Sequence, residues 1–333
     1  MYEYTPEFYP SYTLRFPSLL KSLEMIFAEA PTEIVISTPG PAGLIGLLAA
    51  RLSGIPCRGI YHSDFTKMTE LGLSGGSLAS AVQGYVRWFY SSLDEVRAPT
   101  EESLRSLVRH GYDAARLALF RRGIDTAVFS PLKESRSSLR LRYALDGEFT
   151  LLYVGRVSRD KSVGFIAEVY RELRRRGVLV NLIICGDGPE SEAWRRSFEK
   201  DPRVKLAGRV AREDLPAAYS LSDLFLFPST MDTFGMAVLE AQACGLPALV
   251  TNVGGPQEIV VNEETGYVLP AGQRDVWVDA VVKMRELLVR DPRRIAMMKE
   301  AARRNVSERF GWDEAVEGLF QARLPGKCPA CGR

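Results

Sequence analysis

Two acidic residues flank a predicted helix start and form the most distinctive chemical pattern of the chain. Asp232 and Glu240 are separated by seven residues, and a helix is expected to begin between them near Phe234-Gly235, after the apolar run 224–227. The free N–H groups of a helix N-terminus attract an anion. A carboxylate just before them suits sugar hydroxyls, and a carboxylate about two turns further along suits a ribose. The pattern therefore fits a ligand that combines phosphate groups with sugar rings.

The surroundings of Glu240 bear on two interpretations of this pair. An Asp that caps a helix and a Glu that faces solvent would explain Asp232 alone. That interpretation explains Glu240 less well, because it lies within the apolar run 237–241, where a carboxylate needs a hydrogen-bonding partner.

A pair of cations follows another apolar run, 151–154. Gly155-Arg156 comes directly after this run, and Lys161 lies five residues further on. A guanidinium can donate two hydrogen bonds to phosphate oxygens, and an ammonium adds a compact positive charge. Together with the acidic pair, these residues predict a binding site for a diphosphate. The alternative is a surface loop that carries two cations without a ligand.

Three weaker candidates also follow predicted strands. Gly186 and Gly188 belong to a turn after the run 182–185, where a ligand contact and a tight structural turn are both compatible with the sequence. Lys205 lies in a short strand whose end can face a nucleotide base, although a plain strand end explains it as well. His62 follows an apolar strand, so it is either a ligand contact or a buried structural histidine.

The cysteine content argues against a metal site. Cys328 and Cys331 form a Cys-Pro-Ala-Cys motif near the end of the chain, and the sequence holds no second pair. A structural zinc site needs about four ligands. We therefore predict no bound metal and a tail without fixed structure, with a metal shared between two molecules as the alternative.

Composition limits the class of protein. Of 333 residues, 46% are hydrophobic and 25% are charged, as in ordinary globular domains, and the net charge of +2 disfavours a nucleic-acid binder. Clusters of cations such as 174–176 are expected to face solvent. No apolar run reaches the roughly 18–20 residues of a membrane span, and the first residues lack a signal-peptide pattern. We expect a cytoplasmic protein.

Apolar strands alternate with amphipathic helices along most of the chain. Thr100 is expected to cap one helix, and helical segments separate the strands 149–154, 180–185, 223–227 and 248–251. Such alternation predicts parallel sheets with helices on both faces. We expect an α/β protein with two Rossmann-like domains that face a cleft, in which ligands bind at the carboxyl ends of strands. The expected parts are an N-terminal domain at 1–130, a linker at 131–147, a C-terminal nucleotide-sugar-binding domain at 148–310, and a helix and tail at 311–333.

The motifs resemble those of the retaining glycosyltransferases of family 4, which use nucleotide-sugar donors and have the GT-B fold. The resemblance extends from about residue 16 to residue 321 and is most specific in the second half. The first half is similar to a bacterial subgroup that includes mannosyltransferases. The resemblance is carried by positions 37–41, 61–65, 121–125, 155–156, 161, 186–189, 227–229, 232–235, 239–241 and 245–247.

The resemblance implies a donor site in the second domain. Arg156 and Lys161 would hold the donor diphosphate, and Glu240 would bind the ribose. The donor would be a nucleotide-diphosphate sugar, linked to GDP or UDP. The residues expected around it are Gly155, Arg156, Lys161, Gly186, Gly188, Lys205, Asp232, Thr233, Phe234, Gly235 and Glu240.

The resemblance also implies a mechanism that retains the anomeric configuration. His62 and Asp232 would face the donor sugar. Arg156 and Lys161 would complete the catalytic group. The acceptor would attack from the front face while the leaving diphosphate helps to remove its proton. No metal or other cofactor is expected, because the cations and the helix N-terminus would neutralise the leaving group.

Two departures from the family pattern affect the expected activity. The first acid of the family's carboxylate pair is usually Glu, whereas this chain has the shorter Asp232, which would alter sugar preference or rate. The family also begins with a strand and a glycine-rich loop, and no such pattern precedes residue 34. We therefore expect an incomplete N-terminal sheet, in a fragment, in a chain completed by a partner, or in an impaired enzyme.

The leading hypothesis is a hexosyltransferase that moves a sugar from a GDP- or UDP-linked donor to a lipid or saccharide acceptor. Contact with the inner face of a membrane would accompany a lipid acceptor. The alternative is a catalytically impaired nucleotide-sugar-binding subunit or fragment, which needs a second chain for its N-terminal strands. A sugar-nucleotide epimerase with the same fold is disfavoured by the helix motif at 235–244.

Overall fold

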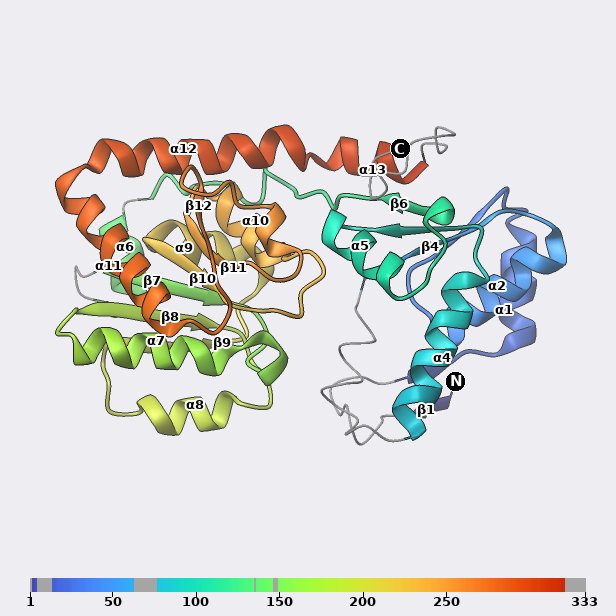
Figure 1. The fold of residues 1–333 in the computed structure, drawn as a ribbon, viewed down its shortest axis with the longest axis horizontal. Helices are drawn as coiled ribbons and strands as arrows, with labels where there is room; N and C mark the ends of the chain where they lie inside the picture. The colour runs from blue at the N-terminus through green and yellow to red at the C-terminus, as the bar shows by residue number, and fades with distance from the viewer. Residues whose placement is uncertain (1, 5–13, 63–76, 135, 146–148, 321–333) are drawn as a thin grey trace. The chain divides into compact units, whose positions relative to one another are not determined.

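The chain forms two compact units, which divide between Arg121 and Arg122. The computed structural model (Figure 1) describes residues 2–4, 14–62, 77–134, 136–145 and 149–320. The division lies before the predicted domain end at residue 130, because Ile124 and Phe129 are buried in the core of the second unit.

A four-stranded parallel sheet forms the centre of the first unit, in the order β3-β4-β5-β6. Thr100 caps α5 as predicted, since its Oγ1 accepts a hydrogen bond from Ser103 N at 3.2 Å. Among the described strands, β3 pairs only with β4 and is therefore an edge of this sheet, while β1 and β2 form a separate antiparallel pair. The elements are β1 (Tyr2–Tyr4), β2 (Leu14–Phe16), α1 (Leu19–Ala28), β3 (Ile34–Ile36), α2 (Pro41–Ser53), β4 (Cys57–Ile60), α4 (Ser77–Ser91), β5 (Glu95–Ala98), α5 (Glu101–Arg109) and β6 (Leu117–Leu119).

Six parallel strands form the sheet of the second unit, in the order β12-β11-β10-β7-β8-β9. Every residue of β7 and β8 is buried, which explains their nearly continuous apolar sequence. The register pairs Phe149 with Val180 and Val154 with Cys185, so the two strands end at the same level. The strands are β7 (Phe149–Val154), β8 (Val180–Cys185), β9 (Val204–Gly208), β10 (Leu224–Phe227), β11 (Ala248–Thr251) and β12 (Gly266–Leu269).

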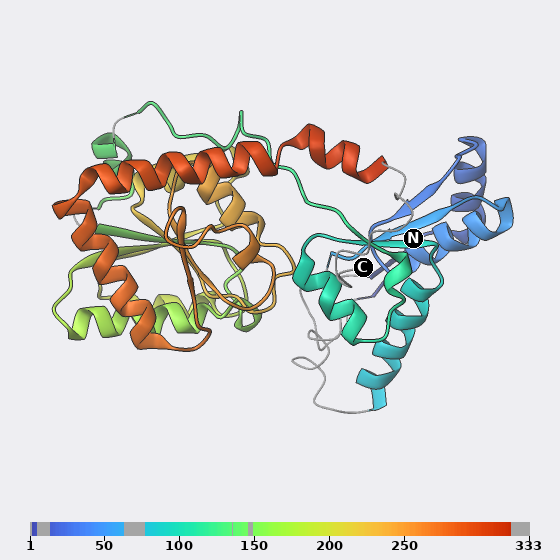
Figure 2. The same ribbon diagram turned by 45° about the horizontal axis from the view of Figure 1, so that its top comes forward.

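Helices connect and cover this second sheet. Figure 1 shows α7 next to α11, and Figure 2 shows α10 against α12, in agreement with the contacts between these elements. Among the described residues, no helix is both long and apolar enough to cross a membrane. The helices are α7 (Val163–Arg175), α8 (Ser191–Phe198), α9 (Leu215–Leu221), α10 (Met236–Ala243), α11 (Arg274–Arg290), α12 (Pro292–Arg309) and α13 (Trp312–Phe320).

The segment predicted as a linker, 131–147, contains a short helix, α6 (Arg136–Arg142). Leu139 is fully buried in the core of the second unit, and α6 packs against α9. Arg140 Nη2 donates to Asp223 Oδ2 at 3.4 Å. Leu139 is the buried apolar residue among the described side chains of this short helix, and one such residue does not produce a periodic sequence pattern. The segment therefore belongs to the second unit and does not only connect two domains.

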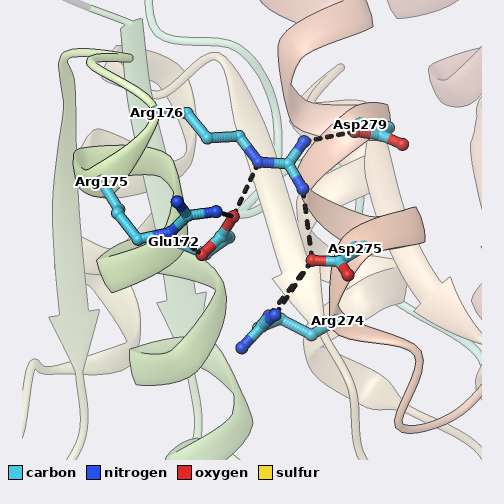
Figure 3. Close-up of polar contacts among 6 residues, drawn as sticks. All are labelled: Glu172, Arg175, Arg176, Arg274, Asp275 and Asp279. Atoms are coloured by element: carbon cyan, nitrogen blue, oxygen red, sulfur yellow. Dashed lines mark hydrogen bonds and ion pairs between the residues drawn. The ribbon is translucent and has the colours of Figure 1, made fainter.

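Helices α7 and α11 are joined by a network of charged side chains (Figure 3). Glu172 on α7 accepts hydrogen bonds from Arg175 Nη2 at 2.6 Å and from Arg176 Nε at 2.8 Å. Arg176 also donates to Asp279 on α11 at 2.7 Å and to Asp275 at 3.2 Å. Hydrogen bonds from the two arginines lower the pKa of Glu172 to about 2. Residues 174–176 are exposed, as predicted, and Arg176 in addition joins the two helices.

Candidate active site

The candidate site lies at the carboxyl ends of β7 and β10, which are neighbours in the sheet. From Val154 the chain passes through Gly155 and Arg156 to the 3-10 turn Arg159–Lys161. Gly155 has a φ of 153°, and a Cβ there would lie 2.8 Å from the hydroxyl of Tyr153. That hydroxyl donates to the carbonyl oxygen of Arg156 at 2.9 Å. The turn is thus fixed at the point where Arg156 leaves the strand.

Two ion pairs position the cations that the sequence assigned to phosphate. Arg156 Nη2 lies 2.7 Å from Asp160 Oδ2, and Lys161 Nζ lies 2.7 Å from Asp232 Oδ1. The second pair joins the loop after β7 to the loop after β10. The four side chains are 19–28% exposed, so a ligand can reach them. The structure therefore places three predicted residues, Arg156, Lys161 and Asp232, in one cluster and adds Asp160 to it.

Asp160 was not among the residues predicted from the sequence. Burial opposes its ionisation, but side-chain hydrogen bonds and the charges of Arg156 and Lys161 lower its pKa below the ordinary value. Asp160 is therefore an anion at neutral pH. With Asp232 it balances the two cations, so the charges of the cluster sum to about zero. Each of the two cations therefore has a carboxylate partner in this structure.

One carboxylate oxygen of the cluster has no hydrogen-bond donor. Asp232 Oδ2 is buried and lacks a partner among the described residues. An unsatisfied buried acceptor costs about 1–3 kcal/mol, so a ligand hydroxyl that donates to it would recover that free energy. Gly255 N donates to the carbonyl oxygen of Asp232 at 2.9 Å, and a Cβ at Gly254 would lie 2.8 Å from the same oxygen. Gly254 and Gly255 therefore pack directly against the loop that carries Asp232.

Helix α10 begins directly after the acidic loop. Its N-cap is Gly235, with a φ of 102°, and a Cβ there would lie 2.9 Å from the ring of Pro256. Val238 N donates to the carbonyl oxygen of Gly235 at 2.9 Å. The N–H groups before it lie at the helix N-terminus, where such groups lack partners within a helix and favour an anion. The side chain of Phe234 does not contribute to this surface, because it is buried and packs edge-on against Phe310 at 5.8 Å. The Phe234 side chain is therefore not available for a ligand, whereas the preceding residue, Thr233, is half-buried.

Gly186 and Gly188 are required by the packing of neighbouring loops. A Cβ at Gly186 would lie 1.8 Å from the carbonyl oxygen of Gly155, and a Cβ at Gly188 would lie 2.4 Å from that of Val157. Val157 N also donates to the carbonyl oxygen of Asp187 at 3.1 Å. These contacts favour the structural-turn interpretation over direct donor contact, because both glycines face the loop after β7.

Lys205 lies away from the phosphate-binding candidates. It is on β9, the edge strand two places from β7 in the sheet. It lines a surface depression together with Arg195 and Phe198 of α8. Neighbouring strands are about 4.8 Å apart, so Lys205 is separated from the Arg156 loop by about 10 Å of sheet. This position of Lys205 does not support its predicted contact with the donor.

Glu240 lies in α10 and has the partner that its apolar surroundings required. Its Oε2 accepts a hydrogen bond from Tyr219 OH at 2.9 Å. Burial raises the pKa of Glu240, and the Tyr219 hydrogen bond and the charge of Arg212 only partly oppose this shift. Glu240 is five residues beyond Gly235, which corresponds to about 7.5 Å along the helix axis. At that distance Glu240 can contact a group that is bonded to an anion at the helix start, and not the anion itself.

His62 belongs to the first unit, at the carboxyl end of β4. It is half-buried and follows Tyr61, whose ring packs edge-on against Tyr90 at 5.4 Å. The motif residues at 63–65 lie outside the described residues. Cys328 and Cys331 also lie outside them.

Asp160, Tyr219 and the Gly254-Gly255 pair are functional candidates that were not predicted from the sequence. Asp160 directly precedes Lys161 and lies four residues after Arg156, a spacing that allows contact within a turn. The two glycines follow β11 and therefore also lie at a carboxyl strand end, which is a usable signal. The spacing of Tyr219 and Glu240 gives no comparable signal, because the two residues lie on different helices.

Two family models match the chain and together cover most of it. The model described as "Glycosyl transferases group 1" matches residues 137–305, and the model described as "Glycosyltransferase Family 4" matches residues 2–128. The first match contains the Arg156, Lys161, Asp232 and Glu240 positions.

Similar proteins agree with these matches. A GDP-mannose-dependent alpha-mannosyltransferase of Mycobacterium tuberculosis is 29% identical over 299 residues, which cover 86% of this chain and 74% of that protein. A D-inositol 3-phosphate glycosyltransferase of Rhodococcus jostii is 28% identical over 84% of this chain and 64% of its own length. The crystal structure of Anabaena HepE with UDP and glucose has a TM-score of 0.74 at 19% identity, over 90% of this chain and 79% of that one. The resemblance inferred from the motifs is thus confirmed, and the chain belongs to the family 4 glycosyltransferases, in the mannosyltransferase-like group with the GT-B fold.

Proposed function

We propose that the protein is a retaining hexosyltransferase that moves a sugar from a GDP- or UDP-linked donor to a lipid or saccharide acceptor. The observation that carries the proposal is the cluster of Arg156, Lys161 and Asp232 directly before α10. It combines two cations, a set of helix N–H groups and a buried carboxylate oxygen that lacks a donor. A sugar linked to a diphosphate supplies a matching group for each of them.

Donor binding proceeds in this proposal by exchange of ion pairs. The diphosphate takes the place of Asp160 at Arg156 and of Asp232 at Lys161. Asp232, released from the ammonium, accepts hydrogen bonds from hydroxyls of the donor sugar. Glu240, about 7.5 Å further along α10, binds the ribose. Exchange of this kind keeps both cations paired with an anion before and after binding, which avoids the cost of an isolated cation.

The transfer step follows from this arrangement. The bond between the anomeric carbon and the phosphate oxygen breaks, and the acceptor hydroxyl bonds to the same face of that carbon. Its proton passes to the leaving diphosphate, so the products are a glycosylated acceptor and a nucleoside diphosphate. Arg156, Lys161 and the first N–H groups of α10 stabilise the charge that develops on the leaving group. With this neutralisation the proposal requires no metal ion, and His62 is assigned to the donor sugar.

The identity of the substrates is proposed from similar proteins. The Mycobacterium tuberculosis relative is described as GDP-mannose-dependent, whereas HepE was solved with UDP and glucose. GDP-mannose is therefore the first donor to test, and UDP-glucose is the second. The relatives described as D-inositol 3-phosphate glycosyltransferases support an acceptor with several hydroxyl groups. We place the reaction in the cytoplasm, and at the inner face of the membrane where the acceptor is a lipid.

Calorimetry and thermal unfolding with GDP, UDP, GDP-mannose and UDP-glucose test the donor site. We expect one nucleotide family to stabilise the protein, and Arg156→Ala to abolish that effect. The proposal fails if none of the four compounds binds, or if Arg156→Ala binds as well as the unaltered protein. The one-bond carbon–proton NMR coupling at the anomeric carbon of the product, which separates the two anomers of mannose as well as of glucose, then tests retention.

A second candidate function is a nucleotide-sugar-binding subunit that needs a partner chain. Helix α1 has no buried residue, although it carries Leu20 and Met25 at 79% and 63% exposure. Apolar surface of this kind often marks an interface, and it is adjacent in sequence to the edge strand β3. Binding of the donor to the purified chain without hydrolysis or transfer would support this second candidate function. Turnover by the isolated chain excludes it.

A further inference from the structure

A hydrogen bond between Tyr219 and Glu240 connects two helices of the second unit. Tyr219 is on α9 and Glu240 is on α10. The tyrosine hydroxyl donates to Glu240 Oε2 at 2.9 Å and lies 3.3 Å from the carbonyl oxygen of Ala237. A hydroxyl has one proton, and a bond to a charged acceptor is the stronger of the two. The proton is therefore directed to Glu240, and Oε1 is left to bind other donors.

The hydroxyl of Tyr219 is held rigidly. Its side chain is 1% exposed, and its ring packs edge-on against Phe225 at 5.8 Å and against Phe129 at 6.3 Å. Glu240, in contrast, is only half-buried. A ligand can therefore reach the carboxylate but not the phenol. A glutamate has three rotatable bonds, and a fixed donor at one oxygen reduces the freedom that a ligand would otherwise have to remove.

We infer that Tyr219 is a positioning residue that orients the carboxylate of Glu240 for the ribose hydroxyls of the donor. The inference rests on the proposed donor site, in which Glu240 binds the ribose. Tyr219 itself touches neither donor nor acceptor in this arrangement. It acts through one hydrogen bond, which fixes Oε2 and turns Oε1 toward the ligand.

The groups around Glu240 determine how this hydrogen bond affects ionisation. They are Tyr219, the cation Arg212 and the thiol of Cys244. Burial raises the pKa of Cys244 to about 12, so the thiol is neutral at ordinary pH. Burial also raises the pKa of Glu240, while Tyr219 and Arg212 oppose that shift. Loss of the hydroxyl would raise the pKa of Glu240 further, and ribose recognition would be lost at a higher pH as pH falls.

A second buried tyrosine provides a matched control. Tyr170 OH donates to Asp201 Oδ2 at 2.9 Å, and its ring packs edge-on against Phe198 at 5.7 Å. The pair has the same chemistry as Tyr219 and Glu240, but it lies beside α8 and contacts none of the donor-site candidates. Tyr170→Phe therefore removes a tyrosine-to-carboxylate hydrogen bond without affecting Glu240.

The experiment compares a ribose with a sugar that lacks its hydroxyls. Calorimetric affinities for GDP and UDP are measured beside those for their 2′,3′-dideoxy analogues, with the unaltered protein, Tyr219→Phe and Tyr170→Phe. We expect Tyr219→Phe to weaken binding of the ribonucleotide about 3- to 10-fold and to leave the dideoxy analogue unchanged. Tyr170→Phe should change neither the affinity for the ribonucleotide nor the affinity for its dideoxy analogue. Below neutral pH, the preference for the ribonucleotide should disappear at a higher pH in Tyr219→Phe than in the unaltered protein.

Other results overturn the inference. If Tyr219→Phe loses affinity equally for the ribonucleotide and the dideoxynucleotide, Tyr219 is a purely structural residue. If it loses affinity for neither, Tyr219 does not position Glu240. If Tyr219→Phe does not fold, Tyr219→Met fills the site with a flexible apolar side chain, and the same comparison decides. A failure of the donor site itself is recognised separately, because Glu240→Ala and Arg156→Ala would then leave GDP and UDP binding unchanged.

Discussion

Lys161 Nζ and Asp232 Oδ1 lie 2.7 Å apart and join two loops, although the two residues are 71 positions apart in the sequence. The same aspartate has a second oxygen that is buried without a partner among the described residues. The pair therefore serves two purposes in the proposed function. In this structure the carboxylate of Asp232 pairs with the ammonium of Lys161. In the proposal, donor binding releases that carboxylate to the sugar hydroxyls.

Asp232→Asn should separate these two purposes. The amide cannot compete for Lys161 as an anion, so free nucleoside diphosphate should bind about 3- to 10-fold more tightly. Transfer should fall by about 10- to 100-fold, because the sugar loses a charged hydrogen-bond acceptor. Calorimetry with GDP and UDP measures the first effect, and product formation measures the second.

The control for Asp232→Asn is Asp275→Asn, which makes the same change of charge. Asp275 lies on α11, pairs with Arg176 and is 62% exposed. It should alter neither nucleotide affinity nor transfer. Weaker nucleotide binding by Asp232→Asn would contradict the exchange of ion pairs.

Arg156→Lys tests whether binding of the diphosphate needs a side chain that can donate two parallel hydrogen bonds. Lysine keeps the positive charge but cannot form two parallel hydrogen bonds or the same contact with Asp160. We expect affinity for nucleoside diphosphate to fall about 3- to 10-fold with lysine and about 10- to 100-fold with alanine, by calorimetry. Arg176→Lys, in the network of Figure 3, is the matched control and should change only the free energy of unfolding. Full affinity in Arg156→Lys would reduce its role to that of a simple charge.

The strands of the second unit were predicted well because their burial leaves a direct mark on the sequence. The predicted bounds of β7, β8 and β11 agree with the structure, and β10 begins one residue later than predicted. Each is buried along its whole length, so nearly every position is apolar. Because parallel strands share one carboxyl edge, these strands also brought Arg156, Lys161 and Asp232 into one prediction.

The local pairing within the site could not be predicted in the same way. The sequence suggests that Lys161 and Asp232 lie near one edge, but their contact depends on the path of two irregular loops. The sequence left a ligand contact and a tight turn both open for Gly186, because a glycine gives no information on which backbone approaches it. Helix α6 was taken for a linker, since a short polar helix with Leu139 in the core gives no periodic apolar pattern. These features depend on tertiary packing, which leaves little periodic signal.

Gly186→Ala should destabilise the fold without removing a ligand contact. The backbone at Gly186 has a φ of 147°, and a Cβ would lie 1.8 Å from the carbonyl oxygen of Gly155. The strained backbone and the clash together should reduce the free energy of unfolding by about 2–4 kcal/mol. Denaturant titration measures this change.

The matched control is Gly164→Ala, in helix α7. A Cβ there meets no atom within 4 Å, and alanine should stabilise the helix by about 0.5–1 kcal/mol. If Gly186→Ala were as stable as the unaltered protein but bound nucleotide weakly, Gly186 would contact the donor after all.

Glu172→Gln should change how stability depends on pH. Hydrogen bonds from Arg175 and Arg176 lower the pKa of Glu172 to about 2, from an ordinary value of 4.5. A pKa that is lower in the folded state gives stabilisation above the unfolded value, and this stabilisation is lost as pH falls from about 5 toward 2. The melting temperature of Glu172→Gln should therefore lie below that of the unaltered protein at pH 7, and the difference should become smaller toward pH 3. Asp279→Asn removes one exposed partner of Arg176 and leaves Glu172 in place, so its pH profile should follow that of the unaltered protein. A constant difference between Glu172→Gln and the unaltered protein from pH 7 to pH 3 would show that the network of Figure 3 acts through packing and not through charge.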